Sequence, residues 1–188
     1  MNDRAWEFLE KTGVIILPED LDHEVYIVIQ TACVMYAQRR LYLFCRGDGG
    51  SSRTANAIVD AVRGHGNVCA VLAGEANSSH GVIFAGCPHR YVYPNAALGV
   101  HRTVLNSMEI VDSAYAKYRF EDLDQSNRMT ARVLASACPL GSQFNEEWWY
   151  GQIEEAGRGL RMFSSTWLIQ NQMAKSVTEI LHELQGLI

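Results

Sequence analysis

Three short segments carry residue types that could act together in nucleophilic chemistry. Gly49 and Gly50 belong to a glycine-rich turn, where backbone amides can point at an anion. Ser78 lies at the start of a predicted helix, near unsatisfied amides and the positive end of the helix dipole. His101 ends a predicted strand, and histidine is the side chain best suited to act as a general base near neutral pH. Each feature alone is more often structural, as a tight turn, a helix cap or a surface histidine.

The elements that must position these residues alternate regularly along the first part of the chain. Short apolar runs predict strands, and apolar residues three and four apart predict helices. The expected strands are 13–17, 41–45, 68–73, 91–93 and 98–100, and the expected helices are 22–40, 52–63 and one that begins near 78. This alternation predicts an α/β fold with a mostly parallel sheet and functional groups at the strand ends.

The second part of the chain has a different character. Residues 108–138 contain no Pro or Gly and keep helical spacing, which predicts one helix about 45 Å long. Its polar stretch 122–128 could project into solvent or against a partner, and two helices broken near Ser126 are the alternative. We expect residues 139–159 to be an irregular insertion, and the amphipathic chain from Trp167 onward to be helical at its end.

Composition restricts the classes of function. The chain has 188 residues, 48% of them hydrophobic and 20% charged, which fits one globular domain. Its net charge of −5 and the lack of a basic block argue against nucleic acid binding. No apolar stretch approaches the roughly 20 residues that cross a bilayer, and we expect no signal peptide and no membrane association. Five scattered cysteines without a C-x-x-C pair indicate reduced thiols and a cytoplasmic location, and no metal or other cofactor is expected.

Taken in order, four segments resemble the Clp protease proteolytic subunit (ClpP) family. Residues 46–60, R-G-D-G-G-S-S-R-T-A-N-A-I-V-D, are similar to that family's N-S-P-G-G-S-x-T-A-G-x-A-I-Y-D. Residues 74–78, G-E-A-N-S, are similar to its G-x-A-A-S nucleophile motif. Residues 90–95 followed by 100–101 resemble R-[FY]-x-L-P-N ending in I-H, and residues 161–165 resemble R-[FW]-[LM]-S-A. The likeness spans residues 8–177.

The resemblance implies both a fold and a chemistry. Ser78 would be the nucleophile and His101 the general base, with backbone amides near Gly49 and Gly50 and of Ser79 as the oxyanion hole. It implies a single domain of ClpP/crotonase-like stacked βα units, with 1–107 and 160–188 as the head and 108–138 as a protruding handle helix. Family members stack two heptameric rings around a chamber, in which peptides or unfolded proteins are cut.

The sequence departs from the family at the site. Leu160 occupies the position of the family's triad aspartate, and Glu154 or Glu155 could substitute by folding back toward His101. The nucleophile also has two candidates, because counting from Gly74 selects Ser78, whereas the family's S-x-G spacing selects Ser79. We prefer Ser78.

Three functional readings follow from this pattern. The first is a serine endopeptidase with an atypical or incomplete triad, and the second is a catalytically weak or inactive ring subunit that keeps the fold. A crotonase-like acyl-CoA enzyme is the third, but the sequence shows no CoA-binding feature. Little chain precedes the first predicted strand, so docking to an ATP-driven unfoldase is left open.

Overall fold

A parallel sheet forms the centre of the protein. The computed structural model describes residues 3–104 and 113–187. The strands lie side by side, all parallel, in the order β1 (Val14–Ile16), β3 (Leu41–Gly47), β5 (Val68–Asn77), β6 (His89–Val92) and β9 (Lys175–Ser176). The strands β1, β3 and β5 are rich in apolar residues because helices and loops cover much of both faces. The predicted α/β class is confirmed.

The long strand β5 divides the sheet into two branches. Its first half pairs with β6, and its last residues pair in parallel with β7 (Ala97–Val100). In turn β7 pairs antiparallel with β8 (Arg161–Ser164), and a separate short pair joins β2 (Asp20–Leu21) to β4 (Gly49–Gly50). Because Asn77 is in register with Gly99, the residues after β5 and β7 emerge next to each other. These residues include Ser78 and His101.

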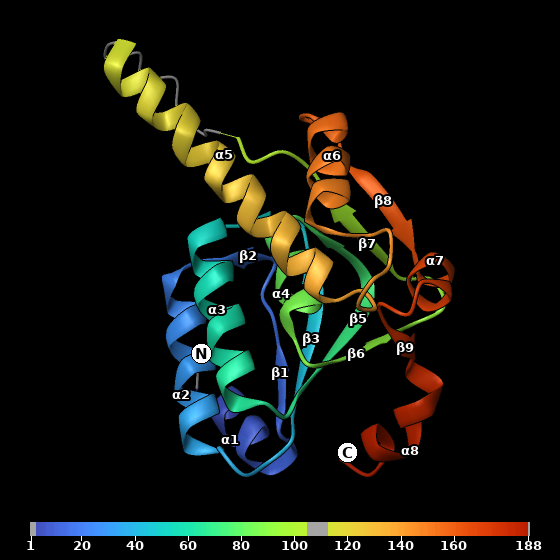
Figure 1. Ribbon diagram of the computed structural model, residues 1–188. Coiled ribbons are helices and arrows are strands. Elements are labelled where there is room, and N and C mark those ends of the chain that lie inside the picture. The colour runs from blue at the N-terminus through green and yellow to red at the C-terminus, as the bar shows by residue number, and fades with distance from the viewer. Residues whose placement is uncertain (1–2, 105–112, 188) are drawn as a thin grey trace.

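The crossover helices cover one side of this sheet (Figure 1). They are α1 (Asp3–Thr12), α2 (His23–Met35), α3 (Ser52–His65) and α4 (Ser79–Gly86). Asp22 caps α2 by accepting from the amide of Val25, and Ser51 caps α3 by accepting from that of Thr54. The predicted helix 22–40 corresponds to α2, and its predicted extension to residue 40 was wrong. The chain turns after Met35, and the guanidinium of Arg39 binds the carbonyl of Lys11 at the end of α1.

One long helix, α5 (Ser113–Ser136), projects from the body (Figure 1). It passes through Ser126 without a break, so the alternative of two helices was wrong. The predicted start at 108 falls on residues 108–112, which lie outside the described residues. Its polar stretch does not simply face solvent, because Asn127 is 1% exposed.

The expectation of an irregular insertion over 139–159 was also wrong, because α6 (Glu146–Ala156) lies within it. Asn145 caps this helix by accepting from the amide of Trp148. Arg132 of α5 forms an ion pair with Glu146 at 3.0 Å, and Trp149 is fully buried. Tertiary packing thus stabilises a helix whose sequence contains a central glycine and is flanked by others.

The C-terminal segment closes the other face of the sheet. It runs through α7 (Ser165–Gln170), β9, a 3₁₀ turn η1 (Val177–Ile180) and α8 (Leu181–Gln185), and α8 is the helix predicted at the end of the chain. Val177 and Ile180 pack on Tyr42 of β3 and on its neighbours Cys69 and Val71. At the same place, the Tyr42 hydroxyl donates to Glu183 at 2.7 Å.

Two further properties concern the described residues alone. None of their helices is both long and apolar enough to span a bilayer. All five cysteines carry free thiols, and four of them are buried.

Candidate active site

Ser78 lies at a sharp turn between β5 and α4. Its backbone has φ 53° and ψ −122°, a conformation that costs a non-glycine residue on the order of 1–3 kcal/mol. The amide of Ser78 donates to the carbonyl of Gly99 at 2.8 Å, which ties the turn to β7. The Ser78 side chain makes no capping hydrogen bond to α4. The common structural explanation of a serine at a helix start therefore does not apply here.

The neighbouring Ser79 has a structural role. It is 3% exposed, and its hydroxyl donates to the carbonyl of Gly50 at 3.0 Å. Ser78 is half-buried, and its side chain lies against Gly49. This geometry favours Ser78 over Ser79 as the candidate nucleophile.

The glycine turn packs directly against Ser78. Gly49 and Gly50 have φ values of 134° and 132°, which glycine adopts readily. A Cβ at Gly49 would lie 2.9 Å from the Cβ of Ser78, and one at Gly50 would lie 2.7 Å from the backbone of Leu21. The absence of side chains therefore lets this backbone approach the serine, as an oxyanion hole requires.

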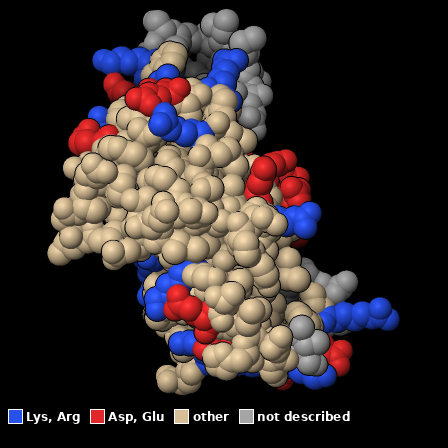
Figure 2. Space-filling view, turned by 90° about the vertical axis from the view of Figure 1, so that its right-hand side faces the viewer, with Lys and Arg blue, Asp and Glu red and all other residues tan. Residues whose placement is uncertain are grey.

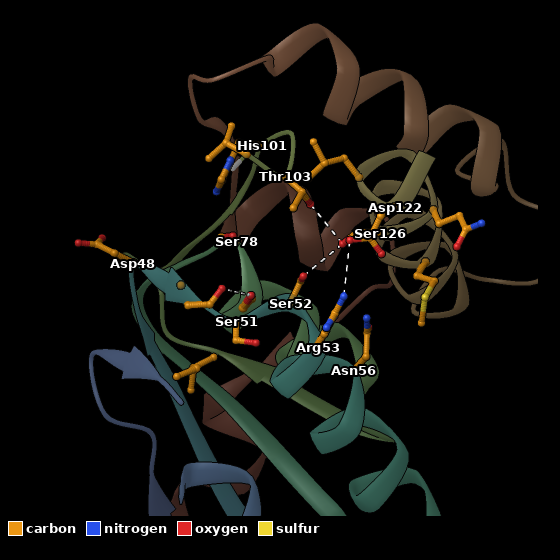
Figure 3. A pocket seen from close by; sticks show the side chains of 18 of the residues that line it. Asp48, Ser51, Ser52, Arg53, Asn56, Ser78, His101, Thr103, Asp122 and Ser126 are labelled. Atoms are coloured by element: carbon orange, nitrogen blue, oxygen red, sulfur yellow. Dashed lines mark hydrogen bonds and ion pairs between the residues drawn. The ribbon is translucent and has the colours of Figure 1, made fainter. Parts of the chain in front are cut away.

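His101 follows β7 on the same side of the molecule, and Figure 3 shows its imidazole pointing toward Ser78. Its Nδ1 lies 2.8 Å from the carbonyl oxygen of Arg102. Because a carbonyl can only accept, Nδ1 carries a proton, and in the neutral imidazole Nε2 then has the lone pair. This is the tautomer that a general base uses toward a serine.

Two helices hold the segment that carries His101. The amide of Arg102 donates to the carbonyl of Gly157 just after α6, and the amide of Thr103 donates to Oδ1 of Asn127 on α5, both at 2.9 Å. The positioning role of Asn127 was not predicted from the sequence. Its only signal there is a neutral amide within a charged helical stretch.

The proposed substitute acids bind other groups. Glu154 lies 3.4 Å from the guanidinium of Arg102 and accepts from Asn127 at 3.2 Å. Glu155 forms an ion pair with Arg161 at 2.7 Å. The hydrogen-bond partner of the His101 ring is thus the carbonyl of Arg102 rather than either glutamate.

Leu160 immediately precedes β8, which pairs with the strand that leads to His101. The antiparallel ladder ends with Val100 paired to Arg161, so His101 and Leu160 are the residues that follow the last pair on each side. The side chain of Leu160 is 49% exposed and has no hydrogen-bond acceptor. A leucine at this position therefore cannot perform the role of a triad acid.

Ser78, His101 and the glycine turn line one cleft of about 1000 Å³. Its opposite wall comes from α3 and α5, which contribute Ser52, Asn56 and Ser126 (Figure 3). The cleft is large enough for several residues of a peptide. Among the described residues, no cluster of His, Cys, Asp and Glu could hold a metal ion.

His80 lies beneath the glycine turn and is fully buried. Its ring fills the space beside Gly47, and its Nε2 donates to the carbonyl of Pro18 at 2.9 Å. The buried Nδ1 has no hydrogen-bond partner among the described residues. Burial lowers the pKa of His80 below its ordinary value of 6.5, although the nearby carboxylates of Glu19, Asp48 and Asp20 oppose this effect.

The lowered pKa of His80 makes the stability of the protein depend on pH. The unfolded chain takes up a proton near pH 6.5 and the folded chain only at lower pH, so the free energy of unfolding should fall as pH drops below 6.5. The limiting slope for one group is about 1.4 kcal/mol per pH unit. Urea unfolding between pH 7.5 and 5 should show a smaller slope for His80→Gln, whose amide can still donate to Pro18. The exposed His182→Gln is the matched control, and equal slopes in the two variants would contradict the assignment.

Comparison with known protein families decides the classification. The profile of the Clp protease family matches residues 2–139, from α1 to the end of α5, and includes the glycine turn, Ser78 and His101. The chain belongs to the Clp protease family. The resemblance seen in the sequence is thereby confirmed, as is the ClpP-like fold.

As a member of the Clp protease family, the protein is a serine-type peptidase at the level of the family. The family match ends at residue 139. Two features that depart from the expected pattern, helix α6 in the predicted insertion and Leu160 at the position of the triad aspartate, therefore lie outside the matched region. No curated protein matches the chain at a significant level.

Proposed function

We propose that this protein is a serine endopeptidase in which Ser78 is the nucleophile and His101 the general base. One observation carries the proposal. The strained turn frees the Ser78 side chain from capping, sets it against Gly49 and opens it to the cleft that His101 also lines. Backbone strain of this kind is characteristic of functional sites.

The reaction would follow acyl transfer through a covalent intermediate. His101 Nε2 takes the proton of Ser78 as its Oγ attacks the peptide carbonyl, and the amides of Gly49, Gly50 and Ser79 stabilise the oxyanion. The protonated imidazole then gives its proton to the leaving amine, and water releases the acyl group by the same steps in reverse order. The Arg102 carbonyl orients the ring but carries no full charge to stabilise the imidazolium. The rate of peptide hydrolysis should therefore be lower than in family members that have the triad aspartate.

The proposal extends to assembly. We infer that the chain forms rings, with seven subunits as in its family, and that α5 joins two rings. The projection of α5 supports this, and so does the broad uncharged surface across the middle of the side shown in Figure 2. Peptides or unfolded proteins would be the substrates, the location would be cytoplasmic, and an ATP-driven unfoldase stays an open partner.

The test is covalent labelling with a fluorophosphonate probe, with the modified residue located by peptide mass spectrometry. The proposal predicts an adduct on Ser78 that is lost in His101→Ala. Ser164→Ala, which changes an exposed serine of β8, is the matched control and should label normally. An adduct of equal yield in His101→Ala would mean that the histidine does not activate the serine.

The second candidate function is a structural ring subunit with little activity. Leu160 is the observation that favours it, because this residue follows the last pair of the strand ladder next to His101, and its side chain cannot accept a proton or stabilise a charge. This candidate predicts assembled rings that do not react with the probe. Labelling of Ser78 would exclude it.

A further inference from the structure

The wall of the cleft that faces Ser78 is polar. On α3, Ser52 and Asn56 are four residues apart and therefore share one face of the helix. Ser126 of α5 and Thr103, which follows His101, lie on the same cleft, and Figure 3 shows α3 and α5 facing each other there. All four side chains are half-buried. The wall therefore offers hydroxyl and amide groups that are partly removed from water.

The three hydroxyl groups form a chain. The Ser126 hydroxyl donates to Oγ of Ser52 at 3.2 Å and lies 3.4 Å from Oγ1 of Thr103. A hydroxyl has one proton and two acceptor sites, so Ser52 keeps its own proton after accepting from Ser126. The side-chain amide of Asn56, one turn after Ser52 on α3, adds two N–H donors and one carbonyl acceptor. A ligand group that can donate and accept would complete these bonds.

The charged side chains of this wall pair with one another. The carboxylate of Asp122 lies 3.6 Å from the guanidinium of Arg53 and 3.9 Å from that of Arg119. This set has one acid and two guanidinium groups, but the side chain of Arg53 is 80% exposed, so water screens the excess positive charge and a charged substrate side chain gains little net attraction here. An apolar side chain would instead cover the hydroxyl groups without replacing their bonds to water, which is unfavourable.

We propose that this wall selects an uncharged polar side chain, of the asparagine or glutamine type, on the residue whose carbonyl Ser78 attacks. This inference rests on the proposed peptidase function and adds its substrate class. A primary amide supplies an acceptor for the Ser52 proton and donors for the hydroxyl oxygens. Leu123 and Met129, which also line the cleft, would contact its methylene groups.

The test compares fluorogenic peptides that differ only in the residue whose carbonyl is attacked. With Gln or Asn at this position, kcat/KM should exceed that with Leu, Glu or Lys by at least about tenfold, since a site built to bond a polar group rejects analogues that lack it. The double variant Ser52→Ala/Ser126→Val should reverse the preference toward Leu. Ser51 still caps α3 in this variant. Thr130→Ala, which removes a hydroxyl of α5 outside the lining of the cleft, is the matched control and should keep the wild-type preference.

Probe labelling of each variant separates the two levels of the proposal. If Ser78 is labelled but Leu is cleaved as well as Gln, the peptidase function stands and the specificity is wrong. The same conclusion follows if the double variant keeps the preference for Gln. If the wild-type protein is neither labelled nor active on any peptide, the proposed function fails and the specificity fails with it.

Discussion

Hydrolysis of a peptide ester should fall by at least about 10³-fold when Ser78 is replaced with alanine. The reason is that no acyl-enzyme can form, so only the oxyanion hole and substrate binding can still accelerate attack by water. The kcat of the purified, assembled variant gives the measurement.

Ser79→Ala is the control that separates the two adjacent serines. It removes the hydrogen bond to the Gly50 carbonyl but keeps the backbone amide of residue 79. Since one such bond contributes about 1 kcal/mol, activity should fall by about tenfold or less. Loss of activity in Ser79→Ala with retention in Ser78→Ala would reverse the assignment of the nucleophile.

Replacing Leu160 with aspartate should raise kcat by about 10- to 100-fold. Residues 160 and 101 follow the last pair of the ladder between β7 and β8, so we expect a carboxylate at residue 160 to accept from Nδ1 and stabilise the imidazolium. The gain should stay below the roughly 10⁴-fold effect of the triad acid in other serine proteases. The reason is that Arg102, which lies next to His101, would compete for the new charge.

Leu160→Asn provides the matched control because its amide has the same shape without the charge. It should raise kcat much less than aspartate does. If neither variant changes kcat while both label normally with the probe, orientation of His101 does not limit the rate, and residue 160 is not the missing position.

The main strands of the parallel sheet and the candidate site residues could be predicted because their signals are local. Glycines in the turn, a serine at a strand-to-helix junction and a histidine at a strand end each occupy a few consecutive residues. The α/β class and the family were confirmed on that basis. The roles of Ser78 and His101 stay predictions, although the observed geometry agrees with them.

The features that could not be predicted depend on contacts between distant parts of the chain. Helix α6 has a glycine in its middle and forms because Trp149 is buried and Arg132 pairs with Glu146. The roles of Asn127 and of the Arg102 carbonyl depend on how α5 and α6 meet the end of β7. No local pattern marks such contacts, and so the sequence left Glu154 as a possible partner of His101, whereas it lies beside Arg102.

The aromatic cluster around α6 gives the protein an optical reporter of its candidate site. Three of its four tryptophans belong to the cluster, in which the rings of Trp148 and Trp167 are nearly parallel with centroids 6.0 Å apart. The ring of Trp149 meets that of Phe163 edge to face at 5.0 Å. Phe163 lies in β8, the partner of the strand that leads to His101. Intrinsic fluorescence therefore follows mainly the part of the molecule that positions His101, without any attached dye.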